Sequence, residues 1–184
     1  CTALTKGRGL DCNRISGGIK NIYFAVFDQV TSIPQTAGEI TDLEMGTNDL
    51  YKYVMPLGVS SLTDTIVGSR ENGTIYYTPT CNIILNRLTK EDQNQIKLLG
   101  ATKTIIFAEL NETLVSSGNN VIVGLGSVNG MELNAGTMDS GAAWGDRNGY
   151  TLTFDGMEAL PFAMVADYTT TPFDNTAFTF GTIV

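Results

Sequence analysis

The chain is divided into short runs of β-branched and aromatic residues that are separated by Gly, Asn, Asp and Pro. The run "GIKNIYFAVFDQV" at 18–30 has apolar residues at both alternating sets of positions, which is typical of a strand covered on both faces. The run "VIVGLGSV" at 121–128 and the strand-like stretch "GYTLTF" at 149–154 continue this pattern. The 24 threonines and 20 glycines among the 184 residues fit the same interpretation. The sequence predicts a mainly β protein with about nine or ten strands.

One segment in the middle of the chain has the signals of a helix instead. In "LTKEDQNQIKLLGA" at 88–101, Thr89 is a suitable N-cap, and Glu91 and Asp92 would lie in the positive first turn. Gly100 provides a stop signal. We therefore expect a β-barrel or sandwich with one mid-chain α-helix packed against it.

The chain contains no internal repeat and no linker-like stretch, so residues 1–184 are expected to form a single domain. The apolar stretch "YKYVMPLGV" at 51–59 is interrupted by Pro56 and Gly58, which predicts a hairpin that projects from the body over residues 34–60. We expect this hairpin and the N-terminal segment 1–18 to be elements of assembly.

Composition argues against several functional classes. The absence of histidine removes the commonest general base and the commonest metal ligand. The net charge of −8 disfavours binding to nucleic acid through phosphate neutralisation. We expect no catalytic residues, cofactor or metal.

The three cysteines, Cys1, Cys12 and Cys81, lack a C-x-x-C spacing and cannot all pair with one another. We expect them to be reduced, with Cys81 in the core of a strand. Since the sequence has no candidate membrane span or signal peptide, we expect a soluble protein that is made in a reducing cytoplasm.

The short motifs of the chain have ordinary structural explanations. The run "GLGSVNG" at 124–130 has the wrong spacing for a dinucleotide fingerprint, and no helix pattern follows it. The loop after Asp146 departs from a calcium loop at Tyr150 and Met157. The sequons at Asn72 and Asn111 are expected by chance in a chain without signs of secretion.

Charge is distributed unevenly along the chain. Residues 1–20 contain four basic residues and one acid, whereas residues 111–184 contain eight acids and the single base Arg147. These two regions could attract each other between neighbouring subunits, or they could be an ordinary solvated surface.

The apolar hairpin, the N-terminal segment and the Phe-rich C-terminus have more hydrophobic residues than the loops and tails of a monomer need, which favours self-assembly. Trp144, the only tryptophan, is the expected packing anchor between subunits. The candidate subunit-interface residues are Lys6, Arg8, Arg14, Tyr51, Tyr53, Met55, Leu57, Trp144, Phe178 and Phe180.

The closing pattern "SGAAWGDRNGYTLTFDGMEALPFAMV" at 140–165 resembles the C-terminal region of major tail tube proteins of tailed bacteriophages. The order of many strands, a mid-chain helix and further strands is similar to their barrel fold. The stretch "CNRISGGIKNIYFAVFD" at 12–28 resembles small structural proteins of phages that infect Bacteroidetes.

This resemblance implies a virion protein of the tail, made in the host cytoplasm, that forms homo-oligomeric rings, commonly hexamers. The rings would stack into a tube through which DNA leaves the capsid, in contact with other phage tail proteins and with no membrane. Such a conduit must not bind DNA, and an acidic lumen would repel its phosphates. Stacked rings also need a heterologous interface, which the basic N-terminal segment and acidic C-terminal loops would supply.

Three alternatives remain open. The first is a capsid decoration or head-completion protein. The second is a carbohydrate-binding β-sandwich in which Trp144 and Tyr150 form a sugar platform. The third is a small hydrolase that uses the paired carboxylates of Glu132 and Glu158.

Overall fold

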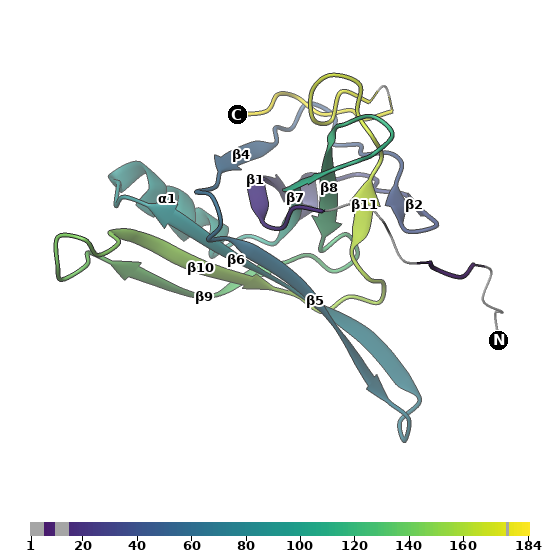
Figure 1. Cartoon of the computed structure of the whole chain (residues 1–184), viewed down its shortest axis with the longest axis horizontal. Helices are drawn as coiled ribbons and strands as arrows, with labels where there is room; N and C mark the ends of the chain where they lie inside the picture. Colours follow the sequence, from purple (N-terminus) through teal and green to yellow (C-terminus); the bar gives the residue numbers. More distant parts are fainter. Residues whose placement is uncertain (1–5, 10–14, 176) are drawn as a thin grey trace.

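The computed structural model describes residues 6–9, 15–175 and 177–184. Their strands form two open sheets rather than a closed barrel, and the molecule is a mainly β sandwich with one α-helix (Figure 1). The seven-stranded sheet has the order β2-β3-β11-β8-β7-β1-β4, and the four-stranded sheet has the order β5-β6-β10-β9. The strands are β1 (Ile19–Val26), β2 (Gln35–Thr36), β3 (Glu39–Ile40), β4 (Tyr51–Val54), β5 (Ser61–Ser69), β6 (Thr74–Asn86), β7 (Thr104–Thr113), β8 (Asn120–Leu125), β9 (Glu132–Asp139), β10 (Gly149–Asp155) and β11 (Ala163–Val165).

The seven-stranded sheet is buried on both faces, as the double apolar pattern of residues 18–30 predicts. Ile22 and Phe24 of β1 face a core that also contains Cys81 of β6 and Phe154 of β10. Tyr23, the residue between them, faces a second core on the opposite side of the sheet. Apolar side chains on both faces are expected for a strand with a layer on each side.

No regular layer covers the second face of the seven-stranded sheet in the described part of the chain; irregular segments cover it instead. Leu43, Met45 and Leu50 come from the stretch before β4, and Phe173 comes from the C-terminal stretch. The rings of Phe173 and Tyr23 pack edge to face at 5.0 Å. The C-terminal residues therefore form part of the core cover.

Helix α1 (Lys90–Leu99) confirms the helix signals of the sequence. Thr89 is the N-cap, and its side-chain oxygen accepts a hydrogen bond from the backbone N–H of Asp92 at 3.0 Å. Ile96 is the buried residue of the helix and packs into the core between the two sheets. A short 3₁₀ turn, η1 (Phe27–Gln29), ends β1. Within the described residues, no helix is long and apolar enough to cross a membrane.

The predicted location of the projecting hairpin was wrong. Residues 34–60 belong to the body, because β2 and β3 pair with each other at one edge of the large sheet and β4 pairs with β1 at the other. The projecting hairpin is instead formed by β5 and β6 (Figure 1). The sequence signals of residues 51–59 are those of a hairpin, but the partner of Tyr51–Val54 lies about 30 residues earlier in the chain.

The β5–β6 hairpin extends well beyond the small sheet. β6 is 13 residues long, but its ladder with β10 ends at Thr80. Residues 64–79, here called the arm, continue beyond β10 to an Asn72-Gly73 turn, where Gly73 has a φ of 64°. At the base of the arm, Tyr77 and Pro79 still form backbone hydrogen bonds with Glu158 and Gly156, and from Tyr77 to the turn the arm is a two-stranded ribbon. Pro79 lies one residue past the end of the β10 ladder, so its missing N–H removes no bond with β10.

Candidate interaction surfaces

The structure places the predicted interface residues in different environments. Lys6, Arg8 and Leu57 are exposed, and the indole of Trp144 is fully exposed. Met55 is only 6 % exposed and belongs to the core between the sheets, so it is not available at the surface of the monomer. Arg14 lies outside the described residues.

The two C-terminal phenylalanines pack against the protein's own core. Phe178 and Phe180 are half-buried, and each ring centroid lies 6.2 Å from that of Phe173. Their apolar surface is therefore largely used within the monomer.

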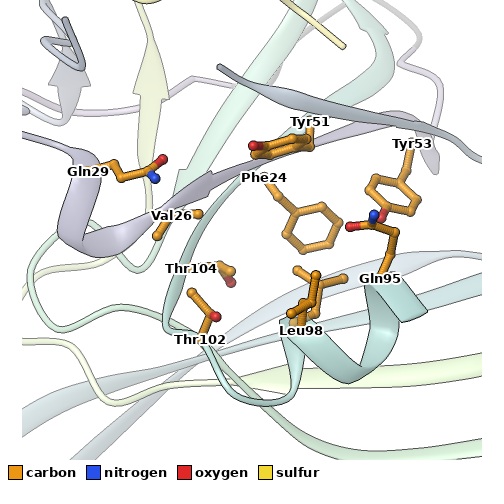
Figure 2. Close-up of a pocket in the computed structure, with 10 residues that line it drawn as sticks. Phe24, Val26, Gln29, Tyr51, Tyr53, Gln95, Leu98, Thr102 and Thr104 are labelled. Atoms are coloured by element: carbon orange, nitrogen blue, oxygen red, sulfur yellow. The ribbon is translucent and has the colours of Figure 1, made fainter. Parts of the chain in front are cut away.

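Tyr51 and Tyr53 line a groove of about 460 Å³ between β4 and the C-terminal half of α1 (Figure 2). Phe24 forms its floor, and Leu98 lies on the helix side. Burial and the nearby Asp92 carboxylate raise the pKa of Tyr53 above its ordinary value. The remaining lining residues are uncharged: Val26, Gln29, Gln95, Leu99, Thr102 and Thr104.

The four-stranded sheet has two free edges. β5 pairs only with β6, and β9 pairs only with β10, so no strand of the described chain lies along the outer edge of either one. β5 is nine residues long and β9 is eight. Long free edges expose rows of unpaired N–H and C=O groups and are ready to pair with another chain.

Two hydrogen bonds of β6 identify which residues face these edges. The N–H of Ile84 points towards β5, where Ser60 Oγ accepts it, and the carbonyl of Pro79 points to the opposite side, where the Gly156 N–H donates to it. The N–H and C=O groups of successive residues point alternately to the two sides of a strand. When this alternation is followed from β6 through β10 to β9, the backbone groups of Gly136 and Met138 point to the free edge of β9.

The hydrophobic core is open at both free edges. A notch of about 270 Å³ beside β9 is bordered by Ile96, Leu133 and Met138. A second notch of about 230 Å³ beside β5 is bordered by Ile19, Leu62 and Leu110. Except for the exposed Met138, these residues belong to the core between the sheets or pack against it, so both notches lie on the same side of the small sheet.

The outward face of the small sheet is mainly polar and carries more acids than bases. Cross-strand rows such as Ser61–Asn82–Thr153 present hydroxyl and amide groups. The acids of the β10 and β9 rows are Asp155, Glu132, which lies opposite it, and Asp139, and the nearby Arg147 donates a hydrogen bond to Thr151 Oγ1 at 2.6 Å. Among these groups the acids outnumber the base Arg147.

Trp144 is presented on an ordered turn between β9 and β10. The Asp146 carboxylate accepts hydrogen bonds from the N–H groups of Ala142 and Ala143 at 3.0 and 2.7 Å. These bonds lower the pKa of Asp146. Asp146, the first position of the calcium-loop pattern that the sequence does not complete, therefore stabilises a turn. This turn exposes the indole of Trp144 to solvent.

The two carboxylates considered for hydrolysis have separate structural partners. Glu158 is buried and accepts hydrogen bonds from the N–H groups of Val128 and Asn129 at 3.1 and 2.9 Å. Its burial raises its pKa, although these backbone bonds oppose the shift. Glu132 is exposed and forms an ion pair with Lys103 at 3.3 Å.

Cys81 lies in the core, as expected, and burial raises the pKa of its thiol to about 12. Cys1 and Cys12 lie outside the described residues.

Sequence reasoning missed two features. Glu109 is a buried carboxylate inside an apolar strand, and its neighbours in the sheet are separated from it by more than 80 residues. The arm was also missed, and the signal that could have located it is Asn72-Gly73, a dipeptide typical of hairpin turns. No family model, curated protein or solved structure matches the chain.

Proposed function

We propose that the chain is a non-enzymatic structural protein of a virion, which forms rings that stack into a phage tail tube for DNA ejection. The observation that supports this proposal best is the pair of free edges on the four-stranded sheet, each beside an opening into the same hydrophobic core. Pairing β9 of one copy with β5 of the next would give hydrogen-bond partners to the backbone groups at both edges and would cover both notches.

The directions of the strands are compatible with such a seam. Neighbouring strands of the small sheet are all antiparallel, so β9 runs opposite to β5. If neighbouring copies are related by rotation about an axis parallel to the strands, the β5 strands of all copies point in the same direction. The β9 strand of one copy would therefore meet the β5 strand of the next in an antiparallel ladder, which is the commoner kind of strand pair.

The seam is heterologous, because one edge meets a different edge. Heterologous contacts generate closed rings when the rotation closes and open helical filaments when it does not. A closed ring would join the small sheets into one continuous wall. We place the polar outward face of this sheet at the lumen and the seven-stranded sheet on the outside.

A lumen with this composition suits the passage of DNA. The rows of Ser, Thr and Asn side chains offer no cluster of cations to hold phosphates, and the basic group beside them, Arg147, lines a surface hollow together with Asp139 and Asp146. Because phosphate neutralisation by Lys and Arg dominates affinity for DNA, this wall would let DNA pass without binding it.

Negative-stain electron microscopy of the purified protein over a concentration series, with sedimentation velocity, tests the proposal. We expect closed rings and hollow tubes, with hexamers as the expected ring. A protein that remains monomeric throughout the series would contradict the proposal and favour decoration or sugar binding.

A variant at the edge of β9 makes the test specific. Met138→Pro removes one N–H that points away from β10, so the strand keeps its own ladder. We expect this variant to fold and to form no rings. Met138→Val retains the N–H and serves as the matched control, which should form rings.

A further inference from the structure

The arm exposes an apolar surface that has no cover in the monomer. In the register of β5 and β6, Ile66 lies opposite Tyr77, and Ile75 lies opposite Gly68. These pairs continue the side of the sheet on which Leu62 and Cys81 face the core. Ile66 and Ile75 are 65 % and 64 % exposed.

Such an arm needs a partner for its stability as well as for its exposed surface. An isolated two-stranded ribbon is marginally stable in water, because it lacks a second layer. The apolar side chains of residues 64–79 would supply that stability only if another surface covered them.

The groove beside α1 is an exposed apolar surface, like the face of the arm that carries Ile66 and Ile75. Phe24, Tyr51 and Leu98 give it an aromatic and aliphatic lining that is open to solvent, and none of its lining residues is charged (Figure 2). The two isoleucines and Tyr77 of the arm are also uncharged. Burying the two isoleucines in the groove would therefore desolvate no ionised group of the groove lining, and Asp64, the acid on the same face of the arm, lies at the base of the arm opposite Pro79.

The charges around the two surfaces are complementary. Arg70 and Glu71 lie at the tip of the arm, outside its apolar face. Helix α1, which forms one wall of the groove, has Glu91 and Asp92 in its first turn and Lys97 in its last. Glu91 already forms an ion pair with Lys90 at 3.5 Å, whereas Lys97 has no ion-pair partner among the described residues, so Lys97 is the charge available to Glu71 of the tip.

The arm cannot fill the groove of its own copy. The tip of the arm and the region of α1 and β4 lie at opposite ends of the molecule (Figure 1). The order of the elements agrees with this placement, because α1 follows the end of β6 that is farthest from the arm. A contact between arm and groove therefore joins two copies head to tail.

We propose that the arm of one copy inserts Ile66 and Ile75 into the groove formed by Phe24, Tyr51, Tyr53, Leu98 and Leu99 of a second copy. This inference rests on the proposed function and adds to it the contact between successive rings. The seam between β9 and residues 61–63 of β5, beside the notch at Leu62, closes each ring, and the arm joins that ring to the next one.

Photo-cross-linking tests the contact directly. A benzophenone amino acid replaces Ile75 in full-length protein, and ¹⁴N- and ¹⁵N-labelled copies are mixed before assembly and irradiation. We expect mixed-isotope cross-links from position 75 to residues 98–103, which contain Leu98 and Leu99, or to Tyr51 and Tyr53. Cross-links only within one copy, only to other segments, or none at all in assembled material would overturn the proposal.

A charge variant separates this contact from the seam. Ile66→Asp/Ile75→Asp should leave the body folded and the rings intact, but raise the protein concentration needed for stacking by at least about tenfold. Val115→Asp changes a more exposed apolar residue, in the turn after β7, and should stack normally. Unchanged stacking of the arm variant would overturn the arm contact and leave the ring proposal intact.

The converse outcome is also distinguishable. If the protein forms linear chains without rings and the arm variant abolishes these chains, the arm contact stands and the ring proposal fails. If the protein is monomeric at every concentration, both fail, since contact between arm and groove would by itself associate the copies.

Discussion

The carboxylate of Glu109 accepts a hydrogen bond from the hydroxyl of Tyr23 at 2.9 Å in the middle of the seven-stranded sheet. Asn21 donates a second bond to the same oxygen at 2.6 Å, and the ammonium group of Lys20 lies 3.3 Å from the other oxygen. Burial and the bond to Glu109 raise the pKa of Tyr23. Three donors from β1 thus compensate a carboxylate that is only 2 % exposed.

We expect Tyr23→Phe to lower the free energy of unfolding by about 1.5–3 kcal/mol, because hydrogen bonds to charged groups are stronger than neutral ones. Urea denaturation measures the change. Tyr150→Phe is the matched control, because its hydroxyl donates to the neutral carbonyl of Thr89 at 3.0 Å; its loss should be nearer about 1 kcal/mol. An equal or smaller loss for Tyr23→Phe would contradict a role in compensating Glu109.

Glu158 should make stability fall as pH rises through the pKa of its carboxyl group in the folded protein. Burial raises this pKa above the ordinary value of 4.5, so the folded state binds the proton more tightly than the unfolded state. Its contribution is fully present below 4.5 and is lost as pH rises through the raised value.

Glu158→Gln removes this titration. We expect the free energy of unfolding of the wild type to decrease relative to that of the variant as pH rises from about 4 to 7, in urea denaturation at each pH. A relative increase of the wild type over this range would mean that the bonds from Val128 and Asn129 dominate over burial.

Trp144→Ala should impair assembly and leave folding nearly unchanged. The indole is fully exposed in the monomer, so the expected change in the free energy of unfolding is within about 0.5 kcal/mol. Thermal melts and sedimentation velocity separate the two effects. Equal loss of thermal stability and of assembly would contradict a role between subunits.

The two glycines that follow Trp144 should respond differently to alanine. A Cβ at Gly149 would overlap the carbonyl oxygen of Leu85 on the neighbouring strand, whereas a Cβ at Gly145 meets nothing within 4 Å. We expect Gly149→Ala to cost about 1–3 kcal/mol of unfolding free energy, as overpacking does. Gly145→Ala should be near neutral in the same urea titration, and similar effects of the two changes would contradict the close strand approach.

Local signals in the sequence were sufficient for several elements. Thr89, the acids after it and Gly100 delimit a helix whose ends depend on neighbouring backbone groups, and that helix is present. The apolar residues on both faces of 18–30 indicated a doubly covered strand, and β1 has a core on each side. The strand at 149–154 was also predicted, because its apolar residues alternate with polar ones, and β10 covers this stretch.

The exposure of individual apolar residues could not be predicted in this way. Met55 and Leu57 lie two residues apart in one apolar stretch, yet Met55 is buried between the sheets and Leu57 is exposed. The stretch 51–59 has the alternation of a hairpin, but pairing with β1 takes Tyr51–Val54 into the sheet. Nothing in the order of residues within the stretch specifies that distant partner.

The sequence by itself determined the mainly β class, the position of the helix and the apolar character of the central strands, because these depend on the periodicity and turn preferences of neighbouring residues. The tertiary structure decided which hairpin becomes the arm, where Glu109 finds its donors and which sheet edges remain free. These features depend on pairing between residues that are far apart in the chain, and the same alternating pattern is compatible with many such pairings.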